Sequence, residues 1–194
     1  TGFTRTSSVG VAGDFGSVSA GVLYTPSFSV IGGSDADGTS AYSTSNLFPS
    51  GVRSSGGFLY TAPKMGDVTA KIMYSNNASG LNDTTKATLQ DISLSYAAGP
   101  LSVAFGTSKA KGVTAAVAGV DAVTSTTAQV LAVAATNTTT NGKVLGVSYD
   151  LGVAKVMLNH ATAKRTNNLT ATTTFKLTES NVGVAVPMGA ISLV

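Results

Sequence analysis

Short turns and long polar connections alternate along the whole chain, and this alternation limits the possible folds more than any other sequence feature. Every second connection of an antiparallel meander lies at the same edge of the sheet. One edge would then carry only tight turns and the other only long loops, an asymmetry typical of a transmembrane β-barrel. The tight turns are Gly13-Asp14-Phe15-Gly16, Pro63-Lys64-Met65-Gly66, Ala98-Gly99-Pro100, Asp150-Leu151-Gly152 and Pro187-Met188-Gly189, and the long connections run roughly over 25–53, 77–86, 110–142 and 164–173.

The hydrophobic residues are dispersed rather than gathered in runs. Of the 194 residues, 43% are hydrophobic and only 11% are charged, with a mean hydropathy of +0.26. The most apolar stretch, Gly112 to Val123, is interrupted by Thr114 and Asp121 and is shorter than the roughly 18 apolar residues of a membrane-spanning helix. The apolar side chains are therefore expected at alternate positions of strands.

Composition and motifs argue against several functional classes. Twenty-two glycines without any cysteine or tryptophan disfavour a helical bundle and a disulfide-stapled domain. The net charge of +3 comes from scattered basic residues, which does not support nucleic-acid binding. His160 is the single histidine, and neither a Gly-x-Ser-x-Gly elbow nor a phosphate-binding loop is present. We therefore expect no enzyme, no cofactor and no metal site.

Period-two alternation predicts about ten strands. Between residues 67 and 74, for example, Val68, Ala70 and Ile72 alternate with Thr69 and Lys71. The expected strands span 3–12, 17–24, 54–62, 67–76, 87–97, 101–109, 143–149, 153–163 and 174–186, with a start at 191.

The charged residues in the middle of these strands favour a barrel over a soluble sandwich. They are Lys71, Asp91, Lys155 and Glu179, and each has the parity opposite to the apolar row of its strand. In a barrel wall that parity faces a watery lumen, whereas a lysine at the lipid-facing midplane costs roughly 2–4 kcal/mol. Tyrosines that close apolar rows near strand ends suit the lipid headgroup level, and these are Tyr74, Tyr96 and Tyr149.

Five hairpins resemble, in the same order, those of Gram-negative general-diffusion porins, especially the betaproteobacterial ones. The first is the stretch from Ser8 to Gly21. The others are Phe58-Leu59-Tyr60-Thr61-Ala62-Pro63, Tyr96-Ala97-Ala98-Gly99-Pro100-Leu101-Ser102, Tyr149-Asp150-Leu151-Gly152-Val153-Ala154-Lys155 and Val184-Ala185-Val186-Pro187-Met188-Gly189-Ala190.

The resemblance implies an all-β transmembrane antiparallel barrel, in which about ten of sixteen strands are present. Residues 1–194 would form a single porin domain that is incomplete at both ends, with about three strands absent on each side. The resemblance also implies a homotrimer in the outer membrane of a Gram-negative bacterium, in contact with lipid and lipopolysaccharide. Ions and small hydrophilic solutes would pass through its lumen.

The resemblance further implies that connection 25–53 folds into the barrel and narrows the pore. Phe28, Val30, Ile31, Tyr42, Leu47 and Phe48 could anchor it, while Asp35 and Asp37 would supply acidic groups. The alternative is a surface loop in which Asp35-Ala36-Asp37-Gly38 makes a turn. A calcium site is not expected, because the remaining ligand spacing is missing.

Porin constrictions place basic residues of the wall opposite acidic residues of this loop. By resemblance, Arg5 and Arg53 match such wall positions, although Arg5 shares its parity with Val9 and Val11. Lys71 and Lys155 have the better strand phase for facing the lumen. Because basic rings favour anions, we expect a weakly anion-selective channel for passive diffusion.

Two other functions stay open at this point. A structural or adhesive bacterial surface β-protein would suit the Ala, Val and Thr repeats of 110–142, but it predicts a fixed coil period, which the sequence lacks. A soluble barrel that binds an apolar ligand would place its apolar parity inside and its charges outside, with short loops at both ends.

Overall fold

A computed structural model describes residues 6–36, 51–78, 85–114, 134–188 and 191–193 of the chain. The described part contains ten strands and one helix. Their bounds are β1 Ser7–Gly13, β2 Gly16–Tyr24, α1 Pro26–Ser34, β3 Arg53–Thr61, β4 Val68–Ala78, β5 Thr85–Ala98, β6 Leu101–Thr114, β7 Thr136–Asp150, β8 Lys155–Asn167, β9 Thr172–Met188 and β10 Ile191–Leu193.

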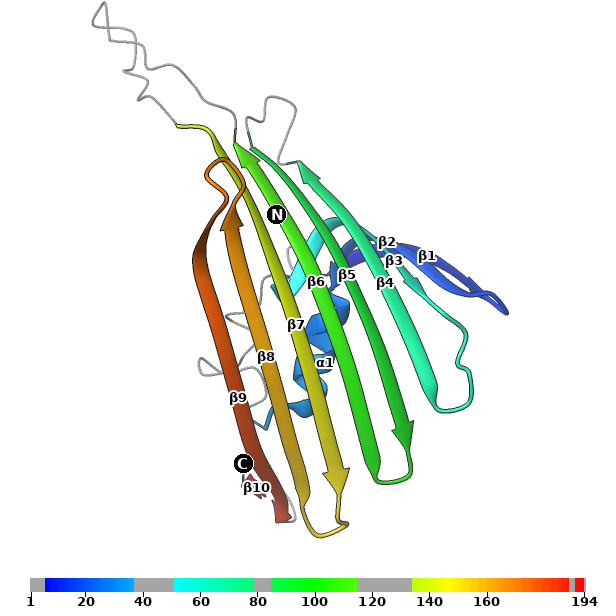
Figure 1. The fold of residues 1–194 in the computed structure, drawn as a ribbon. Coiled ribbons are helices and arrows are strands. Elements are labelled where there is room, and N and C mark those ends of the chain that lie inside the picture. The colour runs from blue at the N-terminus through cyan, green and yellow to red at the C-terminus, as the bar shows by residue number, and fades with distance from the viewer. Residues whose placement is uncertain (1–5, 37–50, 79–84, 115–133, 189–190, 194) are drawn as a thin grey trace, which may run out of the picture.

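The strands form one antiparallel meander in which each strand pairs with the next in sequence, from β1 to β10 (Figure 1). The predicted tight turns join β1 to β2, β3 to β4, β5 to β6, and β7 to β8. The fifth joins β9 to β10, but its residues 189–190 lie outside the described part. At Gly99 and Gly152 the backbone has φ values of 53° and 81°, a left-handed conformation that glycine adopts without steric cost.

The predicted long connection over 164–173 is wrong. Strand β8 continues to Asn167 and β9 begins at Thr172, so that only residues 168–171 connect them. Polar strand ends also extend the β5–β6 and β6–β7 ladders. Strand β6 reaches Thr114, which pairs with Thr85 of β5 on one side and with Thr136 of β7 on the other. These ends are rich in Thr, Asn and Lys on both faces and therefore lack the hydrophobic alternation that marks a strand in sequence.

The two faces of the sheet differ in character. We call the face that contacts α1 the inner face, and the opposite one the outer face. Exposed large apolar side chains follow the outer parity of the successive strands. They include Val9, Val11, Val18, Phe58, Tyr60, Ile72, Tyr74, Ile92, Leu94, Tyr96, Phe105, Leu145, Tyr149, Leu158, Val182 and Val184.

The buried residues lie on the inner face, where α1 packs against the sheet (Figure 1). One cluster joins Val30 and Ile31 of the helix to Val144 of β7 and Ala161 of β8. A second cluster joins strands β2, β4 and β5 through Leu23, Met73 and Leu89. Nowhere in the described ranges is a helix long and apolar enough to cross a membrane.

Candidate functional site

Helix α1 occupies the first part of connection 25–53. Its N-cap, Thr25, has an extended backbone, and its side chain accepts a hydrogen bond of 3.4 Å from the backbone N–H of Phe28. Pro26 follows at the first helical position, where its missing N–H and fixed φ are favourable. The sequence analysis did not predict this helix, although Thr-Pro is a start signal for one.

The two ends of the connection are hydrogen-bonded to each other. The Thr25 backbone N–H donates to the carbonyl oxygen of Val52 at 3.2 Å, and the Thr25 hydroxyl donates to the carbonyl oxygen of Gly51 at 2.8 Å. Residues 37–50, which include Asp37, Tyr42, Leu47 and Phe48, lie outside the described part. The described beginning of the connection thus lies on the inner face, and its exit lies beside its entry.

Asp91 of β5 fixes the beginning of the helix to the wall. Its Oδ1 accepts hydrogen bonds from the backbone N–H of Ser27 at 2.9 Å and from the Ser27 hydroxyl at 2.6 Å. Asp91 and Ser27 are both fully buried. The first backbone N–H groups of a helix lack partners within the helix, and a carboxylate there also interacts favourably with the helix dipole. Asp91, predicted as a lumen charge, therefore serves as a tertiary cap of α1.

Three glycines of the sheet leave room for residues 27–36 because they have no side chain. A Cβ atom added to Gly106 of β6 would lie 2.9 Å from the hydroxyl oxygen of Ser27. At Gly146 of β7 it would lie 2.8 Å from the Cβ of Ser34, and at Gly183 of β9 it would clash with the Cβ of Ala36. These glycines mark the path of residues 27–36 from β6 across to β9. We call them the glycine track.

The acidic residues at the far end of this path lie near β9. Asp35 is the C-cap of α1 and is only 6% exposed. It lines a hollow of about 440 Å³ together with Asn181 and Gly183. The Asn181 side chain donates a hydrogen bond of 3.3 Å to Glu179 Oε1, and Glu179 shares the inner parity of β9. Asp35 and Glu179 thus lie in the same region of the inner face.

Arg53 lies at the entrance of the helical segment. It is paired in register with Tyr24, and its Cζ lies 4.2 Å from the centroid of the Tyr24 ring. It also donates a hydrogen bond to the Tyr24 hydroxyl. The Tyr24 ring in turn stacks on Phe28 of α1 with a centroid distance of 5.5 Å. Arg5, the other predicted arginine, lies outside the described residues.

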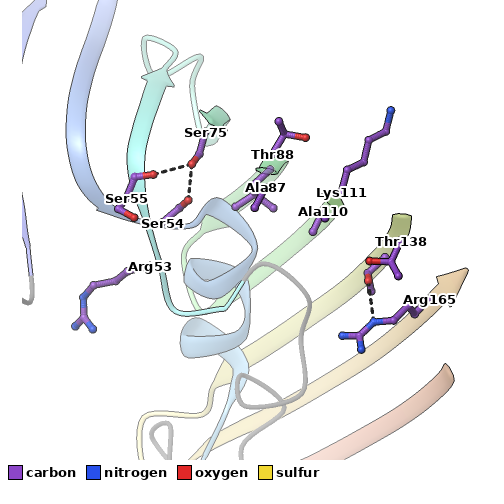
Figure 2. A pocket seen from close by; sticks show the side chains of 13 residues that line it. Arg53, Ser54, Ser55, Ser75, Ala87, Thr88, Ala110, Lys111, Thr138 and Arg165 are labelled. Atoms are coloured by element: carbon purple, nitrogen blue, oxygen red, sulfur yellow. Dashed lines mark hydrogen bonds between the residues drawn. The ribbon is translucent and has the colours of Figure 1, made fainter. Parts of the chain in front are cut away.

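Arg165 is a basic residue with the inner parity of β8 that the sequence analysis missed. It has the same parity on β8 as Ala161, which packs on α1, and its Nε donates to Thr140 Oγ1 at 3.3 Å. Arg165 and Arg53 come from opposite sides of a hollow of about 350 Å³, and the guanidinium of Arg53 points away from Arg165 (Figure 2). Continuing the alternation of 153–163 by one more residue pair would have identified it.

Lys71 and Lys155 lie on the other side of the helix, toward the tight turns. Lys71 of β4 has the parity of buried Met73 and pairs with Ser93 of β5. Lys155 of β8 lies ten residues before Arg165 and has the same parity. Because a strand rises about 3.4 Å per residue, the two basic groups of β8 flank the level of α1 on either side. In the described ranges, no group of three or more His, Cys, Asp or Glu residues could hold a metal ion.

A family model described as Gram-negative porin matches residues 1–194, the whole chain. No curated protein sequence matches it. Among solved structures, the anion-selective porin from Comamonas acidovorans is similar with a TM-score of 0.65 and 20% identity, over 95% of this chain and 53% of that one. The loop L8 deletion mutant of OmpT, an outer membrane protein of Vibrio cholerae, is similar with a TM-score of 0.66 and 16% identity, over 94% and 57%.

These likenesses agree with the predicted fold class, a partial transmembrane barrel. The chain spans about half the length of the solved structures it matches.

Proposed function

Because the chain belongs to the Gram-negative porin family, we propose that it forms part of the wall and the constriction of a water-filled channel. Ions and small hydrophilic solutes diffuse through it passively. Porins lie in the outer membrane and are channels rather than enzymes. We include in the proposal a homotrimer whose outer face contacts outer-membrane lipid and lipopolysaccharide, and long connections that face the cell exterior.

The observation that supports the channel most directly is the position of α1. The helix lies on the inner face, capped by Asp91 and seated on the glycine track. A segment held in this way narrows the space that the curved sheet partly encloses. A structural or adhesive surface protein would have no need of such an infolded segment, so the arrangement favours a channel.

We further propose that the channel is weakly anion-selective. Arg165 lies on the long-connection side of α1, and Lys71 and Lys155 lie on the tight-turn side. An anion would therefore meet fixed positive charge before and after the constriction. The opposing acidic groups are Glu179 and Asp35 near β9 and Asp91, whose Oδ1 accepts hydrogen bonds from Ser27. The likeness to an anion-selective porin points the same way.

Planar-bilayer recording of the purified, folded full-length protein tests both parts of the proposal. Stepwise ohmic openings are expected, and their absence from folded trimers would contradict the channel. In a gradient of potassium chloride, the reversal potential should show a modest preference for chloride. The Arg165→Gln variant should shift this potential toward potassium, whereas Lys64→Gln, in an exposed tight turn, should leave it unchanged. A clear potassium preference of the unmodified protein would overturn the selectivity.

A further inference from the structure

Five of the nine lysines of the chain gather on the outer face of β6, β7, β8 and β9. All five are exposed, and each has the parity of an exposed apolar residue on its own strand, such as Phe105 or Leu145. We call this group the lysine patch. Its members are Lys109, Lys111, Lys143, Lys164 and Lys176.

The strand register brings these lysines into three adjacent cross-strand rows. The central row contains Lys109, Lys164 and Lys176, and in it Lys164 of β8 is directly opposite Lys176 of β9. Like charges directly opposite each other destabilise a sheet. The other members of the three rows are uncharged, and they are Thr88, Gln90, Ile92, Thr107, Thr139, Asn141, Thr162, Thr166, Thr173 and Thr178.

The patch begins where the apolar part of the outer face ends. Lys143 lies two residues from Leu145 along β7, and Lys109 lies four residues from Phe105 along β6. From Phe105 and Leu145 toward the tight turns, the outward residues of these two strands are apolar or aromatic, as with Val103. The lysines therefore lie at the end of the band that suits lipid chains, where a long side chain can reach the headgroup level.

A hollow beside the patch adds uncharged hydrogen-bonding groups. It has a volume of about 560 Å³, and Lys109 and Lys111 line it together with Asn137, Asn141 and Asn168. Asn168 Nδ2 donates to Asn137 Oδ1 at 2.7 Å and to Thr139 Oγ1 at 2.9 Å. The side-chain carbonyl oxygen of Asn168 and the side-chain N–H groups of Asn137 and Asn141 can still accept from and donate to hydroxyl groups. The combination of clustered ammonium groups and neighbouring amides suits a ligand that carries both phosphate and sugar.

We propose that the lysine patch binds the phosphate groups of a phosphorylated glycolipid in the leaflet around the long-connection ends of the strands. A phosphate between Lys164 and Lys176 would offset their mutual repulsion. Each lysine near an anionic lipid surface strengthens binding by electrostatic attraction. The inference rests on the proposed orientation of the channel, because that orientation places these strand ends in the outer leaflet.

The test compares two variants of the folded full-length protein with the same loss of charge. The patch variant is Lys109→Gln/Lys164→Gln/Lys176→Gln. The control variant is Lys64→Gln/Lys71→Gln/Lys155→Gln, whose lysines lie at a tight turn or on the inner face. Binding of diphosphorylated lipid A in neutral detergent micelles is measured by native mass spectrometry. The patch variant should bind at least about tenfold more weakly than the unmodified protein, and the control variant should bind normally.

Several outcomes would overturn the proposal. Equal lipid binding by the patch and control variants would remove the patch as the site. Millimolar inorganic phosphate could displace bound lipid A as effectively as additional lipid A does. That result would indicate a site for free phosphate. A changed oligomeric state with unchanged lipid binding would indicate a contact between subunits. If the patch variant fails to fold, Lys109→Arg/Lys164→Arg/Lys176→Arg should retain binding and Lys164→Gln alone should reduce it.

Channel recordings separate this inference from the proposed function. The patch variant should keep the conductance of the unmodified protein, whereas the control variant should change ion selectivity and keep its lipid. Loss of lipid from the patch variant of a protein that opens no channels would contradict the channel and leave the lipid site standing. Normal channels together with unaltered lipid binding in the patch variant would contradict the lipid site and leave the channel standing.

Discussion

Asp91 of β5 accepts two hydrogen bonds from Ser27, one from its backbone N–H and one from its hydroxyl, and so connects the wall to the first turn of α1. The two residues are 64 positions apart in sequence. This contact is buried and made by a carboxylate, so each bond contributes more than a neutral, exposed one would.

We expect a graded response when the contact is removed in steps. Ser27→Ala removes only the hydroxyl and should lower the free energy of unfolding by about 1 kcal/mol, whereas Asp91→Ala removes both acceptor bonds and should cost about 2–4 kcal/mol. Single-channel recording should show increased open-channel noise in the same order, because the helix is held less firmly. Thermal unfolding followed by circular dichroism gives the stabilities.

An equal response of the two variants would contradict this assignment, because Ser27→Ala retains the backbone bond. Asp91→Asn serves as a further control. Its carbonyl oxygen can still accept from the Ser27 backbone N–H, so its effect should lie between those of the two alanine variants.

The glycine track predicts which small substitutions displace the helix. Gly146→Ala should alter the single-channel conductance and lower stability by about 1–3 kcal/mol, the usual cost of overpacking, because the new Cβ would meet Ser34. Gly112→Ala is a matched control with the same inner parity on neighbouring β6, where the new Cβ would lie 3.5 Å from Thr138 Oγ1. Its conductance should stay unchanged.

A second substitution checks that the steric contact is the cause. Ser34→Gly removes the side chain that Gly146→Ala would meet, so the double variant should recover conductance relative to Gly146→Ala alone. Effects that simply add in the double variant would show that the two residues do not interact.

Period-two alternation was sufficient to predict the order of the strands and their two faces, but not the polar strand ends. The register places Lys71, Asp91, Lys155 and Glu179 on the face that carries α1, as their parity indicated. The effect of these residues on passing ions stays a prediction, as does that of Asp35 and Arg53.

Apart from the start signal Thr25-Pro26, the helix was not predictable from its own residues. Gly32 and Gly33 are poor helix formers, and the stabilising contacts come from residues far away in sequence, such as Asp91 and Gly146. The polar strand ends were missed for a related reason. Residues such as Lys164 and Thr166 carry no hydrophobic pattern, and only backbone pairing with neighbouring strands shows that they are extended.

Lys71 and Lys155 should contribute to ion selectivity. Neutralising both with glutamine should shift the reversal potential in a salt gradient toward the cation, because they supply positive charge on the tight-turn side of α1. Lys64→Gln changes a lysine outside the inner face and serves as the control. An unchanged reversal potential in the double variant would show that ions do not pass close to these two side chains.

A charge should destabilise two adjacent positions of β6 to different extents. Val103 has the outer parity, and its neighbour Ser102 has the inner parity. Lysine at the outer position would meet lipid, so Val103→Lys should lower the free energy of unfolding in vesicles by about 2–4 kcal/mol, the cost of a lysine near the bilayer midplane. Ser102→Lys should cost less than about 1 kcal/mol, because its ammonium group can reach water in the lumen. Urea titration of the protein folded in lipid vesicles measures both values, and a larger cost at Ser102 would mean that the assignment of the two faces is inverted.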